Sequence, residues 1–289
     1  MKKAITLTIN VGTSACPNRC SVCISEMTGK HMLENKNVKW SAFERAVQVA
    51  INYRAENVLF TGKGEPLLFP DQITKYLRIL KKYRKYFTRF ELQTSGDGLP
   101  ECDRYLAKWK RLGLDLVALS AYHFDDVLND EVFHSVKGER MPLVSKMMGL
   151  VGYGFRVRLS FVMMKGYIDS VETVKAALKF AKDWQVFQTT FRELGMPKQW
   201  KNESVAEFVH QHLLNPIDVQ DIKDHFDEHG HLCDTLPFGG SVYEIDGQNA
   251  CLTTCLDQCE DSDELRNLIF FSNGMLSTSW EHPIGTAIL

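Results

Sequence analysis

Three cysteines lie within eight residues near the start of the chain. Cys16, Cys20 and Cys23 form a C-x3-C-x2-C pattern in a loop that directly follows the apolar, β-prone run 4–9. Three thiolates can bind three irons of a [4Fe–4S] cluster, and no fourth cysteine stands nearby at ferredoxin spacing, so one iron is left for a non-protein ligand. An iron with an open coordination position favours chemistry over a structural role.

A zinc site and a group of buried thiols are the two alternatives for these cysteines. Zinc sites usually come as C-x2-C pairs completed by a second pair or by two histidines, and a closed structural site leaves no ligand missing. Cysteines in a protein core act as small apolar side chains. Such cysteines have no reason to crowd into a loop that contains Pro17, Asn18 and Arg19. The pattern therefore favours iron.

The loop resembles the cluster-binding motif of the radical S-adenosylmethionine (SAM) enzymes. The resemblance implies that Cys16, Cys20 and Cys23 bind the cluster, and that the amino and carboxylate groups of the methionine part of SAM chelate the open iron. It further implies that an electron from the cluster cleaves SAM to a 5′-deoxyadenosyl radical. Val22 stands where the family usually has an aromatic residue, which is a mild departure from the motif.

A second motif, Gly62-Lys63-Gly64-Glu65-Pro66, follows the next apolar run of the chain. Glycines let a backbone approach a ligand closely, and a glutamate orients groups by accepting hydrogen bonds. A plain strand-to-helix turn explains a glycine but not the whole motif. The motif resembles the family's Gly-Gly-Glu-Pro, whose backbone contacts the amino group of SAM. Gly62, Gly64, Glu65 and Pro66 are therefore expected at the cofactor, although Lys63 interrupts the usual glycine pair.

Polar residues also end the later strands predicted for this chain. Ser95 follows one strand, Ser120 closes the next, and Arg158 and Ser160 alternate on one face of a third. Relatives hold the ribose and carboxylate of SAM with polar residues at such positions, so the resemblance implies a cofactor role for them. Arg192 ends the sixth strand, where it either clamps a carboxylate bidentately or pairs with a neighbouring acid. A solvated strand end is the alternative for each residue.

Tyr122, His123 and Asp125 follow the fourth strand, on the side where the loops of a parallel sheet bind ligands. We expect them to contact the substrate. The imidazole of His123 is the candidate proton donor, and an ordinary surface histidine is the alternative.

The chain after residue 214 changes character and holds a second group of cysteines. Cys251, Cys255 and Cys259 are separated by three residues each, with Cys233 upstream. Four cysteines can bind an auxiliary iron–sulfur cluster or zinc, although this spacing is unlike that of a zinc ribbon. On a helix the three residues would share one face, so a cysteine-lined helix packed on the barrel is the alternative.

The segment 265–280 predicts a β-hairpin with an Asn-Gly turn. It loosely resembles the C-terminal hairpin of auxiliary-cluster radical SAM proteins of the SPASM and twitch types, which include the enzyme that cyclises GTP in molybdenum-cofactor synthesis. Ser279 or Trp280 stands where those relatives have a cysteine, and the C-terminal Gly-Gly of the GTP cyclase is missing. The resemblance allows a second iron–sulfur cluster, and GTP cyclisation is not expected.

These motifs need a scaffold, and strand-like runs alternate with helical patterns along the first two thirds of the chain. Six strands are predicted, at 4–9, 57–61, 90–94, 114–120, 156–163 and 186–192. Helices are predicted between them, at 41–53 with Ser41 as the N-cap, 73–86, 103–112, 140–152 and 170–183. The alternation indicates the α/β class with a parallel sheet.

Six βα units agree with the partial (β/α)6 TIM-like barrel of the radical SAM family. We expect this barrel at residues 1–214 and a small cysteine-rich α+β extension at 215–289, which begins with a polar helix at 217–228.

Composition places few limits on function. A hydrophobic content of 44% with 24% charged residues is ordinary for a globular enzyme, and a net charge of −2 does not support a nucleic-acid partner. The first residues read as a strand and not as a signal peptide, and no window approaches the ~20 apolar residues of a membrane span. Eight cysteines without a secretory signal predict a reducing compartment, the cytoplasm, and metal binding ahead of disulfides.

The sequence therefore predicts a radical SAM enzyme that abstracts a hydrogen atom from a small-molecule or peptide substrate. Its expected cofactors are a [4Fe–4S] cluster and SAM, and its expected electron source is a reductant such as flavodoxin or ferredoxin. The alternative from another class is a non-catalytic iron–sulfur electron carrier, or a zinc-binding protein that binds a partner through its cysteine-rich tail.

Overall fold

A computed structural model describes residues 3–29, 37–136, 138–196, 200–237, 239–254, 264–280 and 286–287. Within these ranges no helix is long and apolar enough to span a bilayer.

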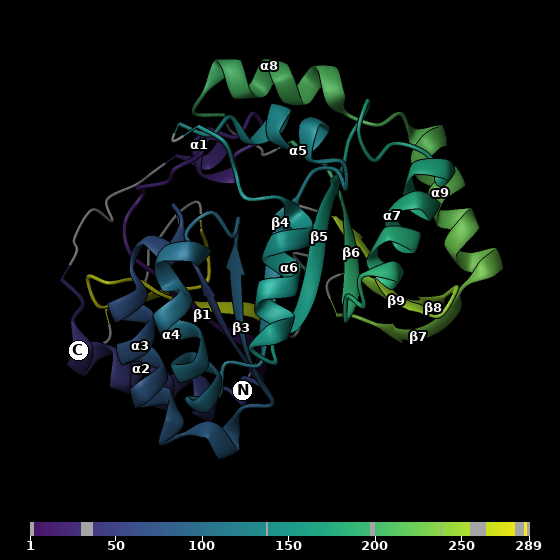
Figure 1. The fold of residues 1–289 in the computed structure, drawn as a ribbon. Helices are drawn as coiled ribbons and strands as arrows, with labels where there is room; N and C mark the ends of the chain where they lie inside the picture. Colours follow the sequence, from purple (N-terminus) through teal and green to yellow (C-terminus); the bar gives the residue numbers. More distant parts are fainter. Residues whose placement is uncertain are drawn as a thin grey trace.

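Six parallel strands form the centre of one curved sheet (Figure 1). They are β1 (Lys3–Asn10), β2 (Asn57–Thr61), β3 (Arg89–Thr94), β4 (Leu116–Ala121), β5 (Arg156–Met163) and β6 (Gln188–Glu193). Each pairs with its sequence neighbours in order, which is the pattern of consecutive βα units. The sheet is not closed, and this confirms the predicted partial barrel.

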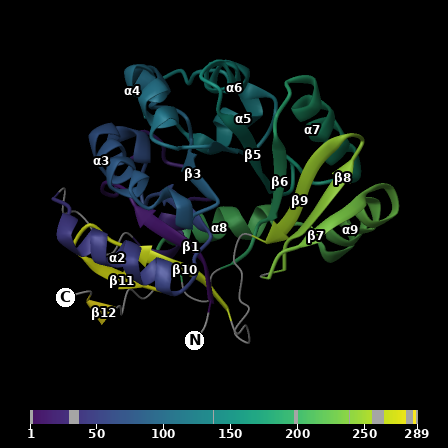
Figure 2. The same cartoon turned by 90° about the horizontal axis from the view of Figure 1, so that it is seen from below.

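Helices cover the outside of the arc, as the view from below shows (Figure 2). They are α2 (Trp40–Asn52), α3 (Pro70–Lys81), α4 (Leu99–Arg111), α6 (Leu143–Gly152), α7 (Val171–Asp183) and α9 (Pro216–His229), with short 3-10 turns at Pro66–Leu68 and Arg84–Tyr86. The predicted N-cap at Ser41 is wrong: α2 begins at Trp40 after Lys39, because the apolar stripe that it buries already starts there.

The main core lies between the strands and these outer helices. On α2 the buried residues recur every three or four positions, at Ala42, Phe43, Ala46, Val47 and Ala50. The outward residues of the strands, such as Leu159 and Phe161 on β5, belong to the same buried cluster. The alternate residues on each strand therefore face the inside of the barrel.

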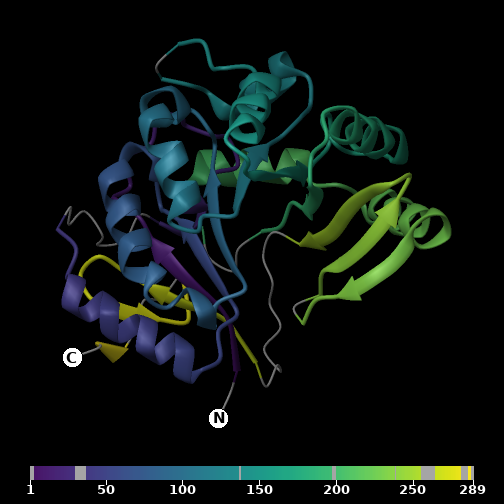
Figure 3. The same cartoon turned by 60° about the horizontal axis from the view of Figure 1, so that its bottom comes forward.

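The tail of the chain extends the sheet at both ends (Figure 3). At one end β9 (Gln248–Thr254) runs parallel to β6 and continues into β8 (Ser241–Ile245) and β7 (His231–Thr235). At the other end β10 (Glu264–Phe270) runs parallel to β1, followed by β11 (Met275–Ser277) and β12 (Thr286–Ala287).

The predicted hairpin at 265–280 is confirmed, since β10 and β11 pair antiparallel around a turn that contains Gly274 at φ 93°. The boundary at residues 214 and 215 stays a prediction. The extra strands nevertheless continue the barrel sheet on both of its edges, so the described part of the tail is not a detached unit.

Three shorter helices lie at the carboxyl ends of the strands. They are α1 (Ile24–Thr28), α5 (Asp126–Phe133) and α8 (Glu203–His212), and α8 crosses above the barrel mouth in Figure 1.

Candidate active site

The three cysteines of the N-terminal motif lie in the loop between β1 and α1. Cys16 is exposed, Cys20 and Cys23 are half-buried, and all three are free thiols. The Cys23 backbone N–H donates to the Cys20 carbonyl at 3.1 Å, and Cys23 is then the N-cap residue of α1. The thiols therefore share one short loop at the carboxyl edge of the sheet, where parallel sheets bind ligands.

Burial governs the acid–base state of these thiols. It raises the pKa of Cys20 to about 12, and it raises the pKa of Cys16 to about 11 although part of that side chain reaches solvent. Nearby thiolate charges raise both values further, so the three sulfurs lie within electrostatic reach of one another. Metal ligands must be deprotonated, so a metal centre would compete with protons here.

The donor set fits a cluster better than a single ion. Among the described residues, no three Cys, His, Asp or Glu side chains converge as ligands of one metal ion. A [4Fe–4S] cluster places each thiolate on a different iron, so its ligands stand further apart.

The Gly-Lys-Gly-Glu-Pro turn packs directly on the cysteine loop. A Cβ added at Gly64 would lie 2.2 Å from the Ala15 carbonyl oxygen, and one added at Gly62 would lie 2.9 Å from the Val11 carbonyl oxygen. The Glu65 backbone N–H donates to the Ala15 carbonyl at 2.9 Å. The two motifs, distant in sequence, are thus joined backbone to backbone, and both glycines are required by close approach.

Glu65 is buried and holds two turns together. Its carboxylate accepts from the Thr94 hydroxyl at 2.5 Å, from the Ser95 N–H and hydroxyl at 2.9 and 2.8 Å, and from the Leu67 N–H at 2.9 Å. Burial raises the pKa of this carboxyl, and the four hydrogen bonds oppose the rise. Ser95 is therefore bound to Glu65, and Pro66 starts the 3-10 turn that follows.

Lys63, the departure from the family motif, points away from the glycines. Its backbone N–H donates to the Asn10 side-chain oxygen at 3.1 Å, and its ammonium donates to the Thr28 hydroxyl at 2.9 Å. The ammonium also lies 5.7 Å from the centre of the Trp280 ring. Lys63 thus links β1, α1 and the C-terminal hairpin while its backbone keeps the turn.

Ser120, Ser160 and Arg192 come together on the inner face of the barrel. Ser120 on β4 is in register with Ser160 on β5. The Arg192 guanidinium donates from Nε to the Ser160 hydroxyl at 2.9 Å. Each lies close to the carboxyl end of its strand, so three adjacent strands bring these polar side chains together.

Arg158 shares this face but lies one layer deeper in the barrel. Its Nη1 donates to a Glu91 carboxylate oxygen on β3 at 2.8 Å, and both side chains are largely buried. Arg158 is therefore engaged across the barrel interior, apart from the Ser120–Arg192 group.

Tyr122 and His123 lie just after β4, and both are 7% exposed. The Tyr122 ring packs on Phe133 at 4.7 Å between centroids, and Tyr122 belongs to the apolar cluster that also contains Val22 of the cysteine loop. The His123 Nδ1 accepts from the Asp125 N–H at 2.9 Å, which leaves the proton of the neutral ring on Nε2. Burial lowers the pKa of His123.

The structure describes only some of the C-terminal cysteines. Cys255 and Cys259 lie outside the described residues. Cys251 lies in strand β9, in register with Thr190, and is 5% exposed on the inner face of the barrel. The helical alternative is therefore wrong for Cys251. Cys233 is exposed on β7.

An apolar cluster covers the mouth of the barrel. The sequence contains only single hydrophobic residues at these positions and no pattern that predicts the cluster. It contains Val22 and Met27 beside the cysteines and Val205 and Val209 of α8. Tyr122 belongs to the same cluster. Such an apolar roof limits the access of water to the thiols beneath it.

A buried ion cluster beside the cysteine loop is the second feature that the sequence analysis missed. Asp97 accepts from Arg140 Nε at 3.0 Å and from the Lys146 ammonium at 2.5 Å, and the amide nitrogen of Asn18 donates to it at 2.6 Å. The side chains of Asp97, Arg140 and Lys146 are 9%, 3% and 2% exposed. Only a polar Ser-Gly-Asp turn after β3 hinted at it.

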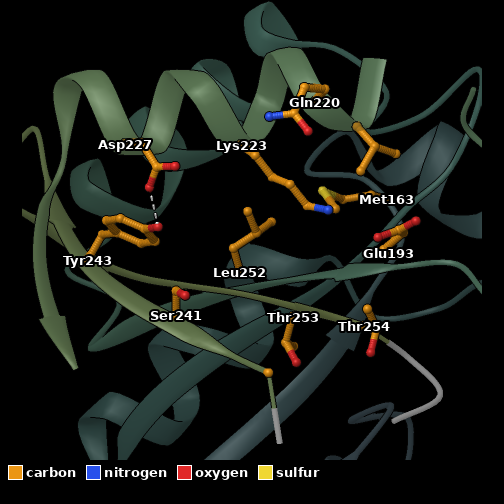
Figure 4. Close-up of a pocket in the computed structure, with 12 residues that line it drawn as sticks. Met163, Glu193, Gln220, Lys223, Asp227, Ser241, Tyr243, Leu252, Thr253 and Thr254 are labelled. Carbon is orange, nitrogen blue, oxygen red and sulfur yellow. Dashed lines mark hydrogen bonds between the residues drawn. The ribbon is translucent and has the colours of Figure 1, made fainter. Parts of the chain in front are cut away.

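A cavity of about 250 Å³ lies between α9 and strands β8 and β9 (Figure 4). Lys223 extends from α9 toward Met163, and Tyr243 donates to Asp227 at 2.6 Å across the cavity wall. Among the described residues, the cavity is lined by no thiol and by none of the predicted cofactor residues.

Comparison with solved structures shows the same fold. Streptococcus suis SuiB, solved with its precursor peptide SuiA, is 16% identical, with a TM-score of 0.58 over 96% of this chain and 60% of SuiB. Native anSMEcpe with bound AdoMet and the Kp18Cys peptide is 18% identical, with a TM-score of 0.54 over 78% of this chain and 60% of that chain.

Sequence comparison finds a curated relative and a family. The probable dual-specificity RNA methyltransferase RlmN of Pseudothermotoga lettingae is 22% identical over 219 residues, and the match spans 67% of this chain but only 58% of that protein. Residues 10–203 match the model of the Radical SAM superfamily, a range that includes the cysteine loop, the Gly-Lys-Gly-Glu-Pro turn and the five barrel strands β2 to β6. The chain therefore belongs to the radical SAM superfamily.

Proposed function

We propose that this protein is an enzyme that binds a [4Fe–4S] cluster through Cys16, Cys20 and Cys23 and generates a 5′-deoxyadenosyl radical from SAM. The cluster, when bound and reduced, supplies one electron to the SAM sulfonium, so that methionine leaves and the deoxyadenosyl radical takes a hydrogen atom from the substrate. A reductant such as flavodoxin or ferredoxin supplies that electron.

One observation carries the proposal. The cysteine loop and the Gly-Lys-Gly-Glu-Pro turn are packed backbone to backbone through Ala15, Gly64 and Glu65. A chain that used these cysteines only as core residues would not need a glycine at the point of closest approach. The contact instead supports a surface on which the polar end of methionine lies between the open iron and the turn.

The inner face of the barrel supplies the remaining groups for SAM. Arg192 is the candidate partner of the methionine carboxylate, since a guanidinium binds a carboxylate through two parallel hydrogen bonds. Ser160 orients Arg192 through its hydroxyl, and Ser120 lies beside it in register. Ser95, Gly62 and Pro66 shape the turns at the same edge. Arg158 acts from the deeper layer, where Glu91 holds it.

The substrate class is a small molecule or a peptide. Solved structures with the same fold were determined with a precursor peptide and with a short peptide bound, which supports a peptide at this mouth. His123 and Tyr122 stand close to the mouth, with His123 as the proton donor through Nε2. The relative from Pseudothermotoga lettingae is named for RNA, so RNA is the class to test against, although a net charge of −2 gives it no bulk support.

A second cluster is the finer part of the proposal. Cys251, Cys255 and Cys259 are its candidate ligands, and iron and sulfide counts per chain separate one cluster from two. About four irons per chain indicate one cluster and about eight indicate two.

Anaerobic reconstitution tests the function. We expect SAM to change the electron paramagnetic resonance spectrum of the reduced cluster, and dithionite with SAM to yield 5′-deoxyadenosine. Cys20→Ala should lose both cluster and product, whereas the exposed Cys233→Ala should keep both. A loaded cluster that is silent toward SAM in both assays would instead favour the non-catalytic electron carrier. Bound zinc without iron would favour the interaction protein.

Cell extracts separate the substrate classes. The fraction that speeds 5′-deoxyadenosine formation is treated with protease, with ribonuclease or with a small-pore filter. Loss of stimulation after protease supports a peptide, and stimulation that passes the filter and survives both enzymes supports a small molecule. Loss after ribonuclease contradicts both assignments.

A further inference from the structure

We propose that Asp97 and Arg140, acting through Asn18, are positioning residues that hold the cluster-binding loop in place. This inference rests on the proposed function, because it assumes that Cys16, Cys20 and Cys23 bind the cluster.

The cysteine loop is held along its length by the last residues of α5 and by the segment that follows this helix. The Arg19 N–H donates to the Phe133 carbonyl at 3.1 Å, the Ser21 N–H donates to the Val132 carbonyl at 3.0 Å, and the Val136 N–H donates back to the Pro17 carbonyl at 2.9 Å. An isolated β-bridge joins Asn18 to Ser135. The loop therefore takes its shape from this segment as much as from its own sequence.

The buried ion cluster ties that segment to the loop. Arg140 stacks on Phe133, with its guanidinium carbon 3.5 Å from the ring centre. It binds Asp130 at 2.6 Å, and its Nε lies 3.1 and 3.0 Å from the two Asp97 oxygens. Asp97 also accepts from the Asn18 amide at 2.6 Å. The Asp97 carboxylate thus joins the loop to Arg140 at a site that is almost fully buried.

Asn18 passes this constraint to the cysteines on either side of it. Its side chain is fixed by Asp97, and it lies two residues after Cys16 and two residues before Cys20. A loop residue that is fixed at its side chain restricts the backbone on both sides, so the Asp97 contact holds these two candidate ligands in place.

Two buried polar atoms at this place lack partners among the described residues. They are Nη2 of Arg140, on a side chain 3% exposed, and Oδ1 of Asn18, on a residue 7% exposed. Leaving buried polar atoms unpaired is costly. The unpaired donor of Arg140 and the unpaired acceptor of Asn18 lie on the two side chains that the Asp97 carboxylate joins.

A purely structural role is the alternative. A buried ion cluster of this kind stabilises α5, α6 and the turn after β3 whether or not a cluster binds. That role predicts a loss of thermal stability without any change in the cluster itself, so the test needs readouts of the loop and of the cluster.

Three variants and one control make the test. Arg140→Gln removes the charge, Arg140→Lys keeps it without the fork, and Asn18→Ala removes only the tether. Asp183→Asn is the control, since it breaks an exposed ion pair with Lys179.

The first readout uses protein without a cluster. In native-state hydrogen exchange we expect the amides of Arg19 and Ser21 to exchange about tenfold faster in Asn18→Ala and Arg140→Gln, because one buried hydrogen bond of the tether is lost. The Asp183→Asn control should exchange at the wild-type rate.

The second readout is the iron and sulfide content of the reconstituted protein. Asn18→Ala and Arg140→Gln should retain about half of the wild-type cluster or less, because the cysteine loop is no longer held, and Arg140→Lys, which keeps a charge beside Asp97, should retain more than Arg140→Gln. Exchange rates and cluster content unchanged in all three variants, with only the melting temperature lowered, would overturn the inference. A wild-type protein that binds no iron refutes the proposed function instead, and the exchange measurement still reports on the tether.

Discussion

At the scale of single residues, Glu65 shows how a motif is satisfied by the protein itself. Its two carboxylate oxygens accept four hydrogen bonds from Thr94, Ser95 and Leu67. The residue that a motif search would assign to the ligand thus acts first as a brace between two turns. Its contribution to SAM binding is to fix the backbone that approaches the cofactor.

Replacing Glu65 by glutamine should therefore damage the site although the shape is kept. The glutamine amide nitrogen is a hydrogen-bond donor, and it would face groups that are themselves donors. This clash lowers the free energy of unfolding by about 1–3 kcal/mol. Urea unfolding measures this loss, and SAM binding should weaken with it. Glu44→Gln, which alters an exposed residue 3.7 Å from Lys82, is the matched control and should change neither quantity. Wild-type stability in Glu65→Gln contradicts the brace.

Substitutions of the two arginines on the inner face of the barrel should affect SAM binding to different extents. Arg192 is held by Ser160 at a strand end, whereas Arg158 is bound to Glu91 one layer deeper. Arg192→Lys loses the fork that binds a carboxylate through two bonds, so we expect about tenfold weaker SAM binding with unchanged cluster content. Arg158→Lys should weaken SAM binding less. Equal affinity of wild type and Arg192→Lys, measured by equilibrium dialysis, removes Arg192 from the cofactor site.

At the scale of elements, α8 matters because it closes the mouth. Val205 and Val209 pack on Met27 and Val22, the neighbours of the cluster cysteines. Helix α8 therefore shields the site without donating any ligand to it.

Val209→Ala should open this shield. The side chain is 0% exposed, and the loss of two methyl groups costs about 2 kcal/mol if the packing does not relax. We expect the cluster absorbance to bleach several-fold faster in air, since solvent and oxygen reach the mouth more often. Ile217→Ala on α9, at a position 71% exposed, is the control. Identical bleaching rates for both variants would show that α8 is not the barrier.

The sequence predicts such elements much better than their long-range contacts. All six barrel strands are apolar runs bounded by turn residues, and each is found within a few residues of its predicted position. The ion cluster of Asp97, Arg140 and Lys146 could not be predicted, because its members come from separate segments with no periodic signal between them. The same holds for Cys251: a strand and a helix both suit its short segment until the partner strand β6 is known.

At the scale of the whole molecule, buried charged side chains join segments that are distant in the sequence. Burial alone would raise the pKa of Asp97, but Lys146 and Arg140 together hold the pKa of that carboxyl below its usual value. A carboxyl with a lowered pKa stabilises the fold above its unfolded pKa of about 3.9, and this stabilisation is lost as the pH falls through the folded value.

The pH dependence of the stability of Asp97→Asn follows from the direction of this pKa shift. The variant leaves Lys146 and Arg140 buried beside a neutral side chain, which costs about 3–5 kcal/mol at pH 7. The difference in unfolding free energy from wild type should shrink as the pH falls below about 4, where wild type also loses the charge. Urea unfolding at a series of pH values measures it. A difference that stays constant down to the acid limit excludes the ionic origin.

The extended sheet predicts that the barrel and the tail unfold as one unit. β9 pairs with β6 and β10 pairs with β1, so the tail completes both edges of the barrel. A chain truncated after Leu214 exposes two long edges, which are ready templates for aggregation. We expect the full chain to unfold in one calorimetric transition and the truncated chain to aggregate or to melt without a cooperative peak. A truncated chain that melts cooperatively as a monomer would establish residues 1–214 as an independent domain, and the added strands would then be an appendage.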